Sequence, residues 1–357
     1  MGVHIMDDNG ELPSPALIVR EAAFEANVAA ADELLHGSPK RIRPHVKTHR
    51  TPALALRQLT AATDGLTCAT VGEAEAMVDA GADDVFIANE VVQTGKLARL
   101  AALARRVRLG VAVDSTEGVR ALGEAARRAN VEVLVLVDVD VGLGRCGVAG
   151  PAAAVELARV VKRTRGLRLE GIMGYEGRLR AGRQDRGRTI GRAYETLAET
   201  KDAFDRAGLA AGTVSSAGTS TLREALADPT ITEIQAGTYA LMEADLDGLP
   251  LPFVPACVVV GTVISRTADR VVLDVGRKSI ACDYGPPVPL LDGAVLESIH
   301  EEHTTLRFGG VAPSLGDRVE LRPGHVRLTF NLHDAVWLVR DDGSVEPAAV
   351  AARGRSW

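Results

Sequence analysis

The chain has 357 residues, 46% of them hydrophobic, which is enough to bury one large core and a smaller one. Its net charge of −6, without a basic patch interleaved with aromatic residues, argues against nucleic acid as a partner. The 4 cysteines show no CxxC spacing, so neither a zinc knuckle nor a disulfide framework is indicated. No apolar run approaches membrane-spanning length and no signal-peptide core is present, so we expect a cytoplasmic protein without a membrane partner.

The first two thirds of the chain alternate strand-like and helix-like segments, after an initial helix predicted over Glu21–Leu35. The predicted strands are Arg41–Thr48, Gly65–Ala69, Asp84–Ala88, Arg108–Val113, Val131–Val139, Leu167–Met173, Gly212–Ser216 and Thr232–Ala236. Helices predicted between them include Val71–Ala80, Gly95–Arg106, Thr116–Arg128 and Ala152–Arg163. This α/β alternation, at a spacing of roughly 25 residues, predicts a closed (β/α)8 TIM-type barrel. An open doubly wound sheet is the alternative, although no GxGxxG follows the first strand to support it.

The composition of the sequence changes at about Pro250. Short segments rich in β-branched residues, separated by Gly, Pro and Asp, begin there. The strands predicted there are Val258–Ser265, Arg270–Asp274, Ala294–Ser298, Arg318–Leu321, Val326–Phe330 and Ala335–Val339. A linker is expected at Gly248–Pro252. We therefore predict a barrel over residues 17–248 and a β-rich domain over 249–357, which also includes residues 1–16.

The most informative segment is the first barrel strand, Arg41–Thr48, which alternates apolar and basic side chains. A helix is predicted directly after it, from Thr51 to about Thr60, so Lys47 would lie at the C-terminal end of the strand. Ligands and chemistry gather at that end of parallel α/β folds. Cationic neighbours such as His45 and His49 would favour the neutral, nucleophilic form of the lysine amine. The alternative interpretation is a solvated basic strand end.

The segment Arg43–His49 resembles the lysine motif of the D-threonine aldolase and eukaryotic-type D-serine dehydratase group. These are fold-type III pyridoxal-phosphate (PLP) enzymes, whose barrel is like the N-terminal domain of alanine racemase. Further similar motifs follow in the order of the group, at Leu12–Val19, Thr70–Glu75, Asp84–Asn89, Val139–Gly147, Gly171–Gly177, Ser215–Ser220 and Gln235–Tyr239. One motif alone would be weak, but this collinear series covers nearly the whole chain.

The resemblance implies a cofactor site for PLP on the barrel. Lys47 would hold the PLP aldehyde covalently, with His45 beside it, while Arg145 would lie near the phenolic oxygen and Tyr175 would contact the cofactor. The residues implied in a phosphate cradle are Ser216, Gly218, Thr219, Gly237, Thr238 and Tyr239. Each also has an ordinary interpretation, because the Gly-rich turns could be plain βα loops, Arg145 a surface residue and Tyr175 a packing residue.

The C-terminal motif departs from the pattern of the group, whose members carry a divalent metal on a His-x-Asp or His-x-Cys pair. Here His325 occupies the first position and Arg327 the second, and a guanidinium cannot coordinate a metal. His303 and Asp334 are candidate replacement ligands. The sequence leaves three possibilities open. A metal could bind through these residues, His325 could act as a base with Arg327 anchoring an anionic group, or the enzyme could move only the Cα proton.

The function that the resemblance implies is PLP-dependent chemistry at Cα of D-configured β-hydroxy amino acids, with Lys47, His325 and Arg327 as catalytic residues. Retro-aldol cleavage to glycine and an aldehyde is the favoured reaction. Metal-independent racemisation or epimerisation and dehydratase-type β-elimination are the alternatives. Single-domain PLP-binding proteins without enzymatic activity lack a C-terminal β-domain, which argues against that class. The resemblance also implies a homodimer with shared active sites, and the identity of the substrate side chain stays open.

Overall fold

The computed structural model describes residues 6–7, 10–209, 211–309 and 312–357, and the chain divides into two compact units. The first, here called the barrel unit, comprises Asp32–Lys47, Leu54–Gly237 and Arg355–Trp357. The second, here called the β unit, comprises Met1–Ala31, Thr48–Ala53 and Thr238–Gly354. The domain boundaries predicted from the sequence, at residues 17 and 248, stay predictions.

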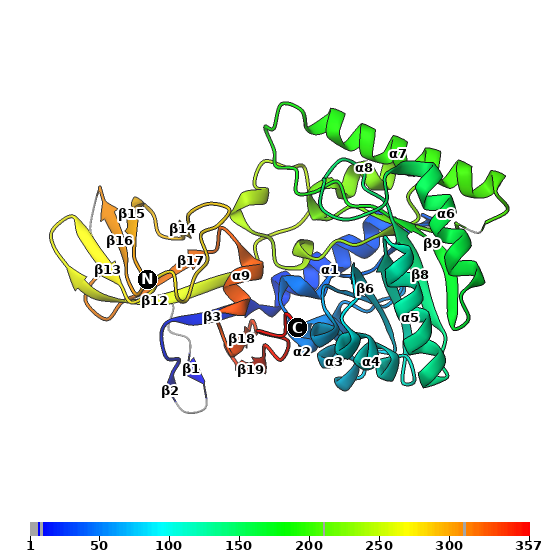
Figure 1. Ribbon diagram of the computed structural model, residues 1–357. Coiled ribbons are helices and arrows are strands. Elements are labelled where there is room, and N and C mark those ends of the chain that lie inside the picture. The colour runs from blue at the N-terminus through cyan, green and yellow to red at the C-terminus, as the bar shows by residue number, and fades with distance from the viewer. Residues whose placement is uncertain (1–5, 8–9, 210, 310–311) are drawn as a thin grey trace. The chain divides into compact units, whose positions relative to one another are not determined.

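The barrel unit is built on eight strands that all pair in parallel (Figure 1). In chain order they are β4 (Arg41–Ile42), β5 (Leu66–Cys68), β6 (Asp84–Glu90), β7 (Arg108–Val113), β8 (Val133–Asp138), β9 (Leu167–Met173), β10 (Thr213–Ser216) and β11 (Glu233–Ile234). The spatial order is β4-β11-β10-β9-β8-β7-β6-β5, and parallel bridges from Ile42 to Thr63 and from His45 to Thr67 join the two ends. The predicted (β/α)8 barrel is therefore confirmed.

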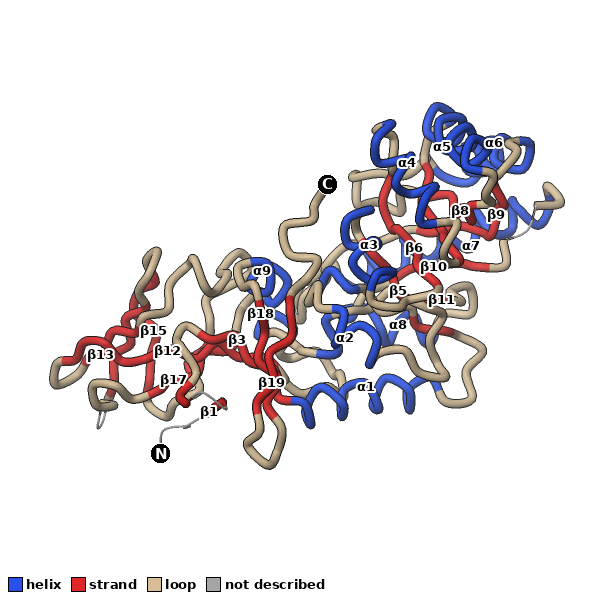
Figure 2. The backbone as a smooth tube through the Cα atoms, turned by 90° about the horizontal axis from the view of Figure 1, so that it is seen from below, coloured by secondary structure: helices blue, strands red, loops and turns tan. Residues whose placement is uncertain are grey.

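Helices follow one another around the outside of these strands (Figure 1 and Figure 2). They are α2 (Pro52–Arg57), α3 (Val71–Asp79), α4 (Thr94–Leu103), α5 (Thr116–Ala129), α6 (Gly150–Arg163), α7 (Arg186–Arg206) and α8 (Leu222–Ala227), after α1 (Glu21–Leu35). Local signals set their ends: α5 begins at Ser115, whose side chain accepts from Gly118 N–H, and ends at left-handed Asn130. No helix in the described part of the chain is long and apolar enough to cross a membrane.

The β unit is built around one long strand, β12, which pairs antiparallel with β3, β13 and β17. Its longer strands are β3 (Ala16–Arg20), β12 (Cys257–Arg266), β13 (Arg270–Leu273), β15 (Ala294–Ile299), β16 (Thr304–Phe308), β17 (Arg318–Arg322), β18 (Ala335–Val339) and β19 (Val345–Ala349). The two-residue strands are β1 (Met6–Asp7), β2 (Gly10–Glu11) and β14 (Val288–Pro289). The β-rich second domain is therefore confirmed. The 4 cysteines are all free, as their spacing predicted.

One predicted strand of the β unit is wrong: Val326–Phe330 belongs to the helix α9 (Val326–Asn331). Its apolar residues fit either structure, because Val326, Leu328 and Phe330 recur at every second position, while Val326 and Phe330 are also four positions apart. The buried carboxylate of Glu243 favours the helix, because it accepts the first N–H of the helix, that of Val326, at 2.7 Å. The sequence prediction also lacked α7, β16 and β19.

Two ion pairs of Arg43 lie at the N-terminal end of the barrel interior, beside apolar side chains such as that of Phe86. Arg43 donates from Nε to Glu233 at 2.7 Å and from Nη1 to Asp84 at 2.7 Å. Only 7% of the Arg43 side chain and 6% of the Glu233 side chain are exposed. Burial alone would lower the pKa of Arg43, but the Glu233 and Asp84 carboxylates reverse this and raise it above its ordinary value. Charge pairing at this end therefore holds three different strands together.

Candidate active site

Lys47 lies just beyond the end of the first barrel strand, in a 3-10 turn formed by Val46–Thr48. The extended pairing predicted for Arg41–Thr48 continues only as far as His45, whose N–H donates to Ala236 O at 3.1 Å. The chain then turns into Val46–Thr48. Lys47 is therefore at the C-terminal end of the barrel, as predicted, but in a turn instead of a strand.

The ring of Tyr175 is the point on which three predicted cofactor residues converge. Lys47 Nζ lies 5.7 Å from its centroid, and the Arg145 guanidinium carbon lies 5.7 Å from the same centroid. A Cβ added to Gly218 would lie 3.6 Å from Cε2 and 3.7 Å from Oη of Tyr175, so a larger side chain would fill this space. An amine for the aldehyde and a cation for the phenolic oxygen, both beside an aromatic ring, fit PLP.

The turn after β10 carries the first part of the predicted phosphate cradle, and Ser216 and Thr219 are both buried there. The Ser216 hydroxyl lies 2.7 Å from Gly174 O and 3.3 Å from a Glu176 carboxylate oxygen. Ala217, between them, adopts a left-handed conformation with φ of 68°. A left-handed residue in a turn is the geometry that brings successive backbone N–H groups to one side, where an anion can bind. The Gly218 N–H, however, already donates to Thr221 Oγ1 at 3.2 Å, so the phosphate cradle at this turn stays a prediction.

The second part of the predicted cradle, Gly237–Tyr239, has residues in both units. Gly237 is the last residue of its segment in the barrel unit, whereas Thr238 begins the 3-10 turn Thr238–Ala240 of the β unit. Tyr239 is 1% exposed and its ring lies 5.5 Å from that of Phe253, in a tilted pair. Tyr239 therefore contributes to the core of the β unit, whatever its backbone binds.

The two histidines that flank Lys47 are both buried, at 5% exposure for His45 and 0% for His49. His49 Nδ1 accepts the backbone N–H of Thr51 at 3.2 Å, so this nitrogen carries a lone pair and the ring is neutral. The expectation that His49 acts as a cationic neighbour of Lys47 is therefore wrong.

The C-terminal pair, His325 and Arg327, lies at the start of α9 in the β unit. Arg327 Nε donates to His325 Nε2 at 3.3 Å, and Arg327 Nη2 donates to Glu243 at 3.5 Å. His325 is 6% exposed, and its ring lies 4.2 Å from that of Tyr284. Since the guanidinium uses the Nε2 lone pair, we assign the ring proton to Nδ1, which lies 3.8 Å from Asp283.

The predicted metal ligands are not gathered around one point. His303 is exposed between β15 and β16, and Asp334 is 90% exposed and paired with Arg353 at 2.7 Å. Among the residues that the structure describes, no group of three or more close His, Cys, Asp or Glu ligand atoms includes His325, His303 or Asp334. Arg327 also uses the Nε2 lone pair of His325, so the described residues do not form a metal site as they stand.

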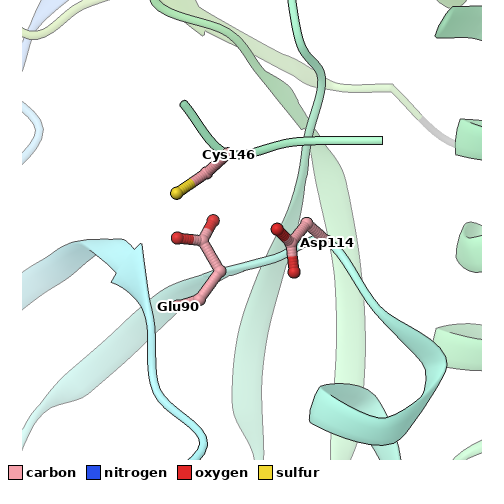
Figure 3. Close-up of side chains that lie close together, drawn as sticks. All are labelled: Glu90, Asp114 and Cys146. Carbon is pink, nitrogen blue, oxygen red and sulfur yellow. The ribbon is translucent and has the colours of Figure 1, made fainter. Parts of the chain in front are cut away.

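Sequence reasoning missed a group of acidic residues at neighbouring strand ends of the barrel unit. Glu90 ends β6, Asp114 follows β7 and Asp138 ends β8. Ligand atoms of Glu90, Asp114 and Cys146 all lie within 4.8 Å of one another, and Figure 3 shows these three side chains pointing toward a common centre. The signal was present, since acidic residues at the C-terminal ends of adjacent parallel strands must meet.

Comparison with known proteins gives matches over nearly the whole chain. Residues 19–245 match the family model described as alanine racemase, N-terminal domain, and residues 256–339 match the one described as putative serine dehydratase domain. A D-threonine aldolase from Arthrobacter sp. is 37% identical over 98% of this chain and 95% of its own length. A 3-hydroxy-D-aspartate aldolase from Paracoccus denitrificans is 30% identical over 98% and 94%.

A solved structure agrees with these matches. The crystal structure of D-threonine aldolase from Filomicrobium marinum superimposes with a TM-score of 0.93 at 37% identity and covers 97% of both chains. The barrel with a lysine beyond its first strand and the β-rich second domain define a fold-type III PLP protein. The chain belongs to the alanine racemase N-terminal domain family, and it carries the serine dehydratase-type C-terminal domain as well.

Proposed function

We propose that this chain is a PLP-dependent lyase that cleaves the Cα–Cβ bond of D-configured β-hydroxy amino acids into glycine and an aldehyde. The observation that carries the proposal is the convergence of Lys47, Arg145 and Gly218 on the Tyr175 ring. The names of the relatives, D-threonine aldolase and 3-hydroxy-D-aspartate aldolase, support the reaction class.

The cofactor site would be built from the barrel strand ends. Bound PLP supplies an electron sink for the substrate carbon that loses a substituent. Lys47 would hold the aldehyde carbon, Arg145 would neutralise the phenolic oxygen and Tyr175 would limit the position of the cofactor ring. His45, beside Lys47, and the main chain of Ser216, Gly218, Thr219, Gly237, Thr238 and Tyr239 would complete the site. The domain predicted at 17–248 would then bind the cofactor, and the domain predicted at 249–357 would activate the hydroxyl group.

His325 and Arg327 would handle the β-hydroxyl group without a metal. A substrate hydroxyl that replaces the Arg327 Nε–H at His325 Nε2 meets a lone pair able to take its proton. As that proton moves, the C–C bonding pair leaves toward Cα and the β-carbon departs as an aldehyde. Asp283, at 3.8 Å from Nδ1, would stabilise the charged ring, and Arg327 would stabilise the developing negative charge on oxygen. His303 and Asp334 stay predictions as metal ligands.

An assay with D-threonine, D-serine and L-threonine, with and without EDTA, tests this function. We expect glycine release from D-threonine that EDTA does not inhibit, because Arg327 takes the place of a metal ligand. Glycine, keto acid and substrate chirality should be followed together. Inversion of the substrate without glycine release, unaffected by EDTA, would indicate a racemase or epimerase instead of an aldolase. Arg327 at the metal-ligand position also favours these metal-independent reactions. Keto acid release would indicate the dehydratase-type elimination that the D-threo-3-hydroxyaspartate dehydratase relative supports.

Replacing Arg327 with alanine should lower kcat/KM. The loss of transition-state stabilisation should be ~2–4 kcal/mol, as expected when a charge-assisted contact is lost. The reason is that its guanidinium contacts both His325 and the fully buried Glu243. Steady-state kinetics with D-threonine measures the effect. Arg307→Ala is the matched control, because that arginine is 55% exposed and only pairs with Asp269 and Glu297. Loss of activity on chelation, restored by a divalent metal, would contradict the metal-free assignment.

We also propose a two-fold homodimer with shared active sites, in the cytoplasm. In such a dimer the isologous interface would place the β unit of one subunit over the barrel mouth of its partner. Light scattering at assay concentration should give twice the monomer mass. A fully active monomer would contradict this proposal and leave the cofactor site unaffected.

A further inference from the structure

The segment that leaves β9, residues 174–176, lies beside the turn that follows β10, residues 216–221, within the barrel unit. Gly174 N–H donates to Ser215 O at 3.1 Å, so the parallel pairing of the two strands continues to their C-terminal ends. Tyr175, on whose ring the proposed cofactor residues converge, therefore leaves the sheet directly next to a turn that is predicted to bind the phosphate of PLP.

The side chain of Glu176 joins these two segments from inside the barrel unit. Only 3% of Glu176 is exposed. Thr221 Oγ1 donates to its Oε1, while the hydroxyl of Ser216 shares its proton between Gly174 O, at 2.7 Å, and Glu176 Oε2, at 3.3 Å. Burial raises the pKa of Glu176, and the hydrogen bonds from Thr221 and Ser216 act in the opposite direction. Both oxygens of the buried acid therefore have hydrogen-bond donors, as a polar group without access to water requires.

The Thr221 hydroxyl transmits this contact to the middle of the turn. Because its proton points to Glu176, an oxygen lone pair can accept the N–H of Gly218, which lies 3.2 Å away. The main-chain N–H of Thr221 donates to Gly218 O at 3.1 Å, so Gly218 is held at both of its polar groups. A Cβ added to Gly218 would lie 3.6 Å from the Tyr175 ring. Glu176 thus fixes, through one buried hydroxyl, the main chain that lies beside this ring.

We propose that Glu176 is a positioning residue, which acts through the Thr221 hydroxyl to fix the turn that binds the phosphate end of PLP. The assignment of this turn to the phosphate rests on the proposed function. A carboxylate and a phosphate are both anions, so Glu176 acts from behind the turn and is not a ligand of the phosphate. Lys47 can still hold the aldehyde when the turn is displaced. The loss should therefore fall on the phosphate end of the cofactor.

A comparison of PLP with pyridoxal, which lacks the phosphate, tests this role on the full chain freed of cofactor. The dissociation constants are read from the absorbance of the lysine-bound form. Glu176→Leu and Thr221→Val should each weaken PLP binding by about tenfold or more, as expected when a hydrogen bond to a charged group is lost. Pyridoxal binding should weaken by less than about threefold. An equal fold loss for both ligands would overturn the positioning role, because a general disturbance of the site weakens both alike.

Further variants show whether the hydroxyl itself is responsible. Thr221→Ser keeps the donor, so its affinity for PLP should stay within about threefold of the wild type. Glu176→Leu and Thr221→Val break the same contact, so the double variant should bind PLP no more weakly than the weaker single variant. Thr196→Val is the matched control, because the Thr196 hydroxyl donates to Arg192 O at 2.9 Å within α7. This control should leave the affinity for PLP unchanged.

Two more results would overturn the role: a Thr221→Ser variant as weak as Thr221→Val, or additive losses in the double variant. Thr221→Val keeps the shape of the side chain, so it carries the test if Glu176→Leu does not fold. Failure of the wild type to bind PLP would contradict the proposed function and this role with it. Equal losses of PLP and pyridoxal in the Glu176→Leu variant would contradict the role alone and leave the proposed function standing.

Discussion

A Lys47→Ala variant is expected to lose D-threonine cleavage by about a thousandfold or more, because it removes the amine that holds the cofactor. No other lysine is placed beside Tyr175 in the described structure, where Lys47 Nζ lies 5.7 Å from the ring centroid. Wild-type protein should be yellow, and borohydride should bleach it by fixing PLP covalently on Lys47. Mass spectrometry of the reduced protein after digestion identifies the labelled residue.

A matched control separates this chemistry from a general effect of removing a lysine. Lys201, which pairs with Asp205 at 2.7 Å on the surface of α7, can be replaced with alanine without approaching the site. Lys201→Ala should keep its colour and its activity. A Lys47→Ala variant that retained both covalent PLP and full turnover would end the assignment of Lys47.

An Arg43→Met variant is expected to lose about 3–5 kcal/mol of stability, the range measured when one partner of a buried ion pair is removed. Glu233 would then be a buried carboxylate that keeps the hydroxyl of Ser215, at 2.7 Å, but has lost its cation. Protonating this carboxylate removes its uncompensated charge, so the variant should regain stability as pH falls toward acid values. Urea unfolding followed at several pH values measures both effects.

Two further variants make the Arg43 experiment specific. Adding Glu233→Gln to Arg43→Met removes the stranded charge and should recover part of the loss, because the amide can still accept from Ser215. Arg106→Met, at an exposed pair with Asp79, should cost less than about 1 kcal/mol. Equal losses from Arg43→Met and Arg106→Met would show that the buried network at the barrel end contributes little.

The sequence by itself determined the barrel and the lysine. Each strand and helix of the barrel is a local pattern, and a strict alternation of the two has few ways to pack. Lys47 could be placed because a strand end is a local feature, whereas Arg145, Tyr175 and Ser216 were assigned to the site because their motifs resemble those of the family. The Tyr175 ring, on which Lys47, Arg145 and Gly218 converge, follows from these strand ends.

Only the tertiary structure decided which distant side chains meet. Val326–Phe330 alternates like a strand, yet Glu243, more than 80 positions earlier, accepts its first N–H and starts a helix. The same contact brings Arg327 onto His325 Nε2, which no spacing in the sequence could indicate. Asp138 and Glu90 are far apart in the chain, and only the closed sheet brings the ends of their strands to one side, where burial and then the charge of Glu90 raise the pKa of Asp138. Hydrogen bonds and pKa values depend on burial and on distances through space, whereas a sequence pattern specifies only the local backbone and the face of each side chain.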